Sequence, residues 1–92
     1  MRPLVRIDMI KGRGRKEQRL IADVLHNCAV EAFSLSVRDR FQIITEHEPH
    51  LMIIQDVGLG FDRSNDVVVQ ITSTPRSLAA RKKFYALAAE RL

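Results

Sequence analysis

The sequence predicts a small α/β domain in which a strand, a long helix and a second strand form a βαβ unit, followed by another strand and helix. Residues 4–10 alternate in the manner of a strand, and residues 15–33 carry apolar side chains at helical spacing. Residues 67–72 are the most strand-like run of the chain. Because 92 residues is an ordinary domain length, we expect one domain over residues 1–92.

The first strand is predicted to stop at Gly12 and Gly14, and the helix to begin just after them. Cys28 lies on the buried face of this helix, so a structural thiol is favoured over a reactive nucleophile. His26 lies off that face and is predicted to be a surface residue. The apolar residues of the buried face recur three and four positions apart, and they are Ile21, Val24, Leu25, Cys28 and Ala32.

The second strand is predicted at residues 40–47. A helix between two strands of one sheet makes a right-handed crossover, so these two strands should be parallel. The sequence His47-Glu48-Pro49-His50 has the residue types of a metal site. However, Pro49 forces a turn where a helix would be needed to align the two histidines. We therefore expect two solvated histidines in a loop, and no bound metal.

Residues 67–72 are expected in the middle of the sheet. A second helix should follow, with Ser77 as its N-cap. Arg76 would then lie at the carboxyl end of a strand, where α/β sheets tend to bind ligands, although alone it would be interpreted as a surface arginine. The apolar stripe of this helix is Ala80, Phe84, Leu87, Ala88 and Leu92. The last strand of a second βαβ unit is apparently absent, which would leave a sheet edge open. We expect either that a neighbouring subunit covers this edge or that the chain is a shortened one.

The net charge of +4 raises the question of a polyanionic partner. Five basic residues lie close together near the start of the predicted helix, and we call them the basic cluster. This cluster lacks the interleaved aromatic residues, helix-turn-helix pattern or zinc spacing of nucleic-acid-binding modules, so we expect no nucleic-acid partner. No apolar run approaches the length of a membrane span and no signal peptide is evident. With a single cysteine, these features favour a cytoplasmic protein with no membrane partner. The cluster comprises Lys11, Arg13, Arg15, Lys16 and Arg19.

Pro3 stands next to the start of the chain and directly before a strand. An amino-terminal proline is a secondary amine, and in apolar surroundings it can act as a base or acid at neutral pH. Here Arg2 precedes Pro3, so the encoded proline nitrogen is an amide and neither accepts a proton at neutral pH nor forms an imine. Any chemistry at Pro3 therefore depends on removal of Met1 and Arg2.

Eight short segments together resemble the tautomerase superfamily, with its 4-oxalocrotonate tautomerase-like fold, and are most similar to its malonate semialdehyde decarboxylase branch. This resemblance implies a fold of tandem βαβ units, an assembly of three or six subunits with the trimer favoured, and no cofactor. It also implies catalysis by an amino-terminal proline. The segments are residues 3–8, 12–13, 31–33, 38–43, 46–47, 58–60, 63–64 and 75–76.

Transferred onto this sequence, the resemblance makes Pro3 the catalytic base or acid and Asp39 a carboxylate that acts on water or supports the proline. Arg76 would be catalytic and would bind the substrate carboxylate, beside Thr74, which stands where the decarboxylase branch carries a second arginine. The implied activity is keto-enol tautomerisation of a small keto or aldehyde acid, with decarboxylation or hydration as variants. The alternative is a catalytically impaired oligomeric homologue whose proline is blocked by Arg2.

Overall fold

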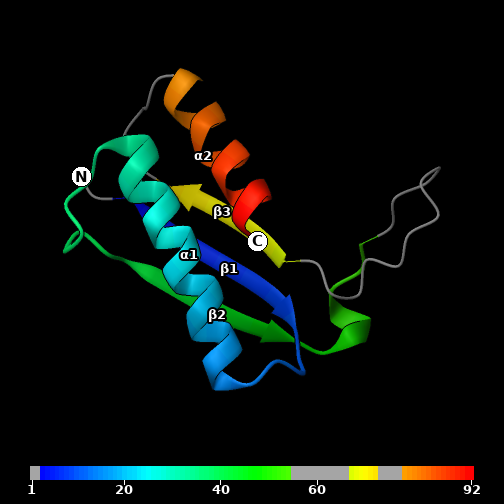
Figure 1. The fold of residues 1–92 in the computed structure, drawn as a ribbon. Helices are drawn as coiled ribbons and strands as arrows, with labels where there is room; N and C mark the ends of the chain where they lie inside the picture. The colour runs from blue at the N-terminus through cyan, green and yellow to red at the C-terminus, as the bar shows by residue number, and fades with distance from the viewer. Residues whose placement is uncertain (1–2, 55–66, 73–77) are drawn as a thin grey trace.

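The elements of the fold follow the predicted order. The computed structural model describes residues 3–54, 67–72 and 78–92. The first strand and the long helix have the predicted bounds, and the second strand begins two residues later than predicted. The elements are β1 (Leu4–Ile10), α1 (Arg15–Phe33), β2 (Gln42–His47), the 3₁₀ helix η1 (Pro49–Leu51), β3 (Val67–Thr72) and α2 (Leu78–Arg91). Figure 1 shows them as a sheet with the two helices packed beside each other.

The three strands form one sheet in the order β2-β1-β3. β1 pairs in parallel with β2, as the βαβ unit predicts, and antiparallel with β3. The prediction that residues 67–72 lie in the middle of the sheet is wrong, because β1 holds that place among the described strands. β3 is rich in β-branched residues, yet every second residue is exposed. That alternation is typical of a strand with one covered face.

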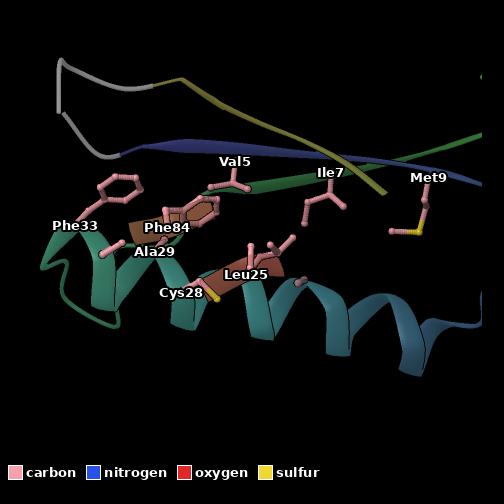
Figure 2. Close-up of a cluster of buried hydrophobic side chains, with 11 residues drawn as sticks. Val5, Ile7, Met9, Leu25, Cys28, Ala29, Phe33 and Phe84 are labelled. Carbon is pink, nitrogen blue, oxygen red and sulfur yellow. The ribbon is translucent and has the colours of Figure 1, made fainter. Parts of the chain in front are cut away.

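The core lies between the sheet and the two helices (Figure 2). Phe33 at the end of α1 stacks on Phe84 of α2, with ring centroids 5.6 Å apart. This stack closes the core at the end where β1 starts. Leu92, predicted as part of the second helical stripe, is 56% exposed because α2 ends at Arg91. The largest fully buried side chains are Phe84, Ile7, Met9, Leu25 and Cys28.

The other face of the sheet carries polar and apolar side chains together. Asp8 of β1 lies on this face, and its Oδ1 is 2.7 Å from Nε2 of His47. The prediction of two solvated loop histidines is therefore wrong for His47, which is the last residue of β2 and the register partner of Ile10. His50 is exposed, as predicted. β2 continues through His47 because its pairing with β1 extends to the end of β1.

The buried thiol of Cys28 leads to a prediction about reactivity. Cys28 is fully buried, and burial is the main reason that the pKa of its thiol is raised, against the opposing effect of Arg91. A raised pKa keeps the thiol protonated at neutral pH, and only the thiolate is nucleophilic. In the folded protein we expect Cys28 to react with a disulfide reagent such as DTNB at least about a hundredfold more slowly than in denaturant. Rapid modification of the native protein, followed by absorbance, would contradict this.

Candidate functional site

Pro3 and Asp39 lie at the same end of the sheet. The backbone N–H of Val5 in β1 donates to the carbonyl oxygen of Phe41, just before β2, over 2.9 Å. Pro3 precedes Val5 by two residues, and Asp39 precedes Phe41 by two residues. Because β1 and β2 are parallel, both segments approach the sheet from the same side. The two residues therefore stand on neighbouring segments at the start of a strand pair.

The last residue of β3 lies at the same end of the sheet as Pro3 and Asp39. β3 runs antiparallel to β1, and Leu4 is the register partner of Thr72, the last residue of β3. Figure 1 shows the tip of the β3 arrow at the end where β1 begins. Thr74 and Arg76, predicted to bind substrate, and Ser77, the predicted N-cap, lie outside the described residues. In the sequence, Thr74 and Arg76 follow Thr72 by two and four positions.

Pro3 is buried, while Asp39 is partly exposed. Pro3 comes directly before β1, whose inward-facing residues Val5 and Ile7 are almost fully buried. Burial in apolar surroundings disfavours the charged form of an amine. The position of Pro3 therefore suits a prolyl nitrogen that is to serve as a neutral base once it is free.

Asp39 belongs to a tightly turned segment, residues 34–41, which we call the Asp39 loop. α1 ends at Phe33, and its C-cap residue Ser34 takes a left-handed conformation with φ 54°. The backbone N–H of Asp39 donates to the carbonyl oxygen of Ser36 over 2.9 Å, and that of Arg40 donates to Arg38 over 3.0 Å. Asp39 is thus the central residue of a three-residue turn. These bonds fix the backbone on both sides of the Asp39 side chain.

His26 links α1 to the Asp39 loop. Its Nε2 is 2.9 Å from the carbonyl oxygen of Val37. The prediction of a surface histidine is wrong, since the His26 residue is only 7% exposed. The apolar stripe gave no sign of this, because the loop itself covers the side of α1 on which His26 lies. A carbonyl only accepts hydrogen bonds, so the imidazole Nε2–H is the donor.

Arg40 forms a second link between the Asp39 loop and α1. Its Nη2 is 2.7 Å from Oδ1 of Asp23, and its Nε donates to Oε1 of Gln42 over 2.7 Å. The Gln42 side chain in turn donates to the carbonyl oxygen of Ala22 over 2.8 Å. The hydrogen bond from Arg40 is the main cause that lowers the pKa of the Asp23 carboxyl. Asp23 is therefore ionised at neutral pH, and the pair keeps both charges.

Sequence reasoning missed His26, Arg40 and Gln42 as supports of the site. The one signal available was the strand alternation, which places Gln42 on a face of β2 together with Ile44 and Glu46. That face proves to be the one turned toward α1, since the Glu46 carboxylate accepts a hydrogen bond from Gln18 of α1. A glutamine on the helix-facing side of a strand needs a polar partner. Its partners, however, could not be named without the fold.

Other binding chemistries find less support in the described part of the chain. Within it, no group of three histidine, cysteine, aspartate or glutamate side chains is placed to hold a metal ion. None of its helices is both long and apolar enough to cross a membrane. Three members of the basic cluster are engaged in ion pairs, as is usual for a solvated helix start. The pairs are Lys11–Glu48 at 2.9 Å, Arg13–Glu17 at 3.6 Å and Arg19–Asp23 at 3.1 Å.

Two family models match this chain. Both are described as tautomerase enzyme, and they cover residues 3–62 and 39–92. "Probable tautomerase YrdN" of Bacillus subtilis (strain 168) is 48% identical over 91 residues, which span 98% of this chain and 70% of that protein. Together the two family-model ranges span residues 3–92 and include all of the candidate site residues.

Two solved structures are similar to this one over 96% of the chain and 69% of theirs. One is a malonate semialdehyde decarboxylase, studied for its decarboxylase and hydratase activities, with a TM-score of 0.88 and 31% identity. The other is FG41 malonate semialdehyde decarboxylase inhibited by 3-bromopropiolate, with a TM-score of 0.85 and 38% identity. Sequence and fold thus indicate the same group of enzymes.

Proposed function

We propose, from the premise that this chain belongs to the tautomerase superfamily, that it is a cofactor-free enzyme of keto-enol tautomerisation. Its substrate would be a small keto or aldehyde carboxylic acid. The observation that carries the proposal is the pairing of β1 with the start of β2 through Val5 and Phe41, which sets Pro3 and Asp39 on adjacent segments. A prolyl base and a carboxylate side by side are suited to moving a proton between two positions of one substrate.

The proposed chemistry assigns one task to each residue. Pro3, once freed, takes a proton from the substrate enol and returns a proton at carbon, which forms the keto acid. Arg76 holds the substrate carboxylate by a bidentate, charge-assisted pair. Asp39 accepts and releases a proton, orients a water molecule, or supports the proline. The buried setting of Pro3 supports its role, because it favours the neutral amine.

Tautomerisation is the favoured activity among the family's reactions. In the decarboxylase branch that this chain resembles, a second arginine stands where this chain has Thr74. A threonine hydroxyl supplies one hydrogen bond and no charge, so a departing carboxylate would be oriented less firmly. Decarboxylation and hydration are therefore secondary proposals. The competing proposal is an impaired homologue in which Arg2 keeps the Pro3 nitrogen an amide.

We also propose that the protein assembles with copies of itself, with a trimer as the expected state. Both helices cover one face of the sheet, and on the opposite face Val68 of β3 is 44% exposed. β2 and β3 each pair on one side only among the described strands. A second copy would cover these apolar and edge groups together. The trimers and hexamers of the superfamily support this assembly.

The first prediction concerns the processing of Pro3. A form that begins at Pro3 should ketonise phenylenolpyruvate faster by orders of magnitude than the form that begins at Met1, because only the free amine has an available lone pair. Absorbance across a pH series measures the rate. Pro3→Ala in the processed form should lose most of the activity. Equal rates in the two forms, or an unaffected Pro3→Ala variant, would favour the scaffold proposal.

The second prediction concerns Arg76. Arg76→Ala should lower kcat/KM for a carboxylate substrate by about 10- to 150-fold, which corresponds to the roughly 1.5–3 kcal/mol of a charge-assisted hydrogen bond. Arg81→Ala, which removes an exposed arginine of α2, is the matched control and should change kcat/KM little. If both variants match the parent, Arg76 does not bind substrate. Loss of inhibition by 3-bromopropiolate in Arg76→Ala would be an independent sign of a carboxylate site.

The third prediction concerns assembly. Light scattering should give the mass of a homo-oligomer at micromolar concentration. Val68→Lys should shift the measured mass toward that of the monomer, because burial of a charged lysine between subunits is unfavourable. Leu78→Lys changes a residue of similar exposure on α2, on the helical side, and should leave the assembly intact. A monodisperse monomer for the unmodified protein would contradict the proposal.

A further inference from the structure

We propose that His26 and Arg40 are positioning residues, which hold the Asp39 loop on α1 and thereby keep Asp39 in place for proton transfer. The inference rests on the proposed function and adds two residues to it. Neither residue needs to touch substrate. His26 is bonded to the residue two positions before Asp39, and Arg40 directly follows Asp39. The two anchors therefore flank the carboxylate along the chain.

The His26 anchor is a part-buried polar contact made by a buried residue. The residue is 7% exposed, and its Nε2 lies 2.9 Å from the carbonyl oxygen of Val37. Buried polar groups without a partner are costly, so the ring and the carbonyl depend on each other. The contact joins the middle of α1 to the loop, and α1 is in turn fixed by the buried face that contains Leu25 and Cys28. The loop is thereby tied to the hydrophobic core through α1.

The Arg40 anchor uses the fork of the guanidinium group. One nitrogen pairs with the Asp23 carboxylate at 2.7 Å and another donates to Gln42 at 2.7 Å. The first contact reaches α1 and the second reaches β2. A lysine has one point of charge and could satisfy only one of these directions. Arg40 therefore fixes the place where the Asp39 loop enters β2.

Core packing does little to hold the loop, so its position depends mainly on polar contacts. Its two ends are bonded to α1 and β1 through Leu35 and Phe41. The His26 and Arg40 contacts hold the part between them. Val37 is 69% exposed and Phe41 is 50% exposed. Leu35 alone among the loop's apolar side chains packs against the core. The turn around Asp39 is internally bonded, so we expect residues 36–40 to shift together if the two anchors are lost. Displacement of a catalytic group by about 1 Å can cost about a hundredfold in rate.

The test compares His26→Leu, His26→Gln and Arg40→Lys in the form that begins at Pro3. We expect His26→Leu to lower kcat by about tenfold or more with KM changed less than about twofold, because the substrate carboxylate is still bound elsewhere. His26→Gln should restore most of kcat, since its amide N–H can reach the Val37 carbonyl. Arg40→Lys should fold and should lower kcat in the same way.

Two further measurements separate positioning from stability. Amide hydrogen exchange at Asp39, whose N–H bonds to Ser36, should become faster in His26→Leu and in Arg40→Lys. Cys28→Ala removes a buried side chain from the same helix and is the matched control for lost stability. It should leave kcat and the Asp39 amide nearly unchanged under native conditions. In an Asp39→Asn background, His26→Leu should have little additional effect on kcat, because both changes act through one group.

The inference is overturned by a folded His26→Leu variant with full kcat, by an equal loss of kcat in the Asp39→Asn background, or by an Asp39 amide that exchanges at the parent rate. Retention of full activity by Asp39→Asn would also overturn it. If the unsubstituted processed form is inactive, the proposed function fails by itself. Amide exchange at Asp39 then still decides whether His26 and Arg40 hold the loop.

Discussion

The pairing of β1 along both its edges is the constraint on which the rest of the structure depends. β2 bonds to one edge in parallel and β3 to the other in the opposite direction. Because of these strand directions, the first residues of β1 and β2 and the last residues of β3 lie at the same end of the sheet. The inward-facing side chains of β1 also form the sheet side of the core, and they include Ile7 and Met9. A single strand thus organises both the packing and the candidate site.

The local elements could be predicted because local physics determines them. The bounds of β1 and α1 follow from alternation, helical spacing and the two glycines, of which Gly12 takes φ 136° at the turn between them. The burial of Cys28 followed from the same spacing. The place of β3 could not be predicted this way. β-Branched side chains favour any strand, and whether a strand lies at the centre or the edge depends on partners distant in the sequence.

The residues of the candidate site likewise divide into those that the sequence could identify and those that only the fold reveals. Asp39 was identified by resemblance and Pro3 by its position near the start of the chain, and the structure brings their segments together through the pairing of Val5 with Phe41. His26 was misjudged because a helical pattern describes only the side of a helix that meets the core. The partner of His26 is a backbone carbonyl of a loop, and no side-chain pattern encodes a carbonyl. Supports of this kind become visible only when the chain is folded.

Because a whole helix separates Pro3 from Asp39 in the sequence, the candidate site forms at a late stage of folding. Parallel strands joined by a helical crossover are contacts between residues far apart in sequence, and such contacts form late relative to local ones. On a ribosome, the chain emerges with Pro3 long before Phe41 is available to accept the hydrogen bond of Val5. The two residues first meet when the crossover has closed. Closure of the pairing between β1 and β2 is therefore a precondition for assembly of the candidate site.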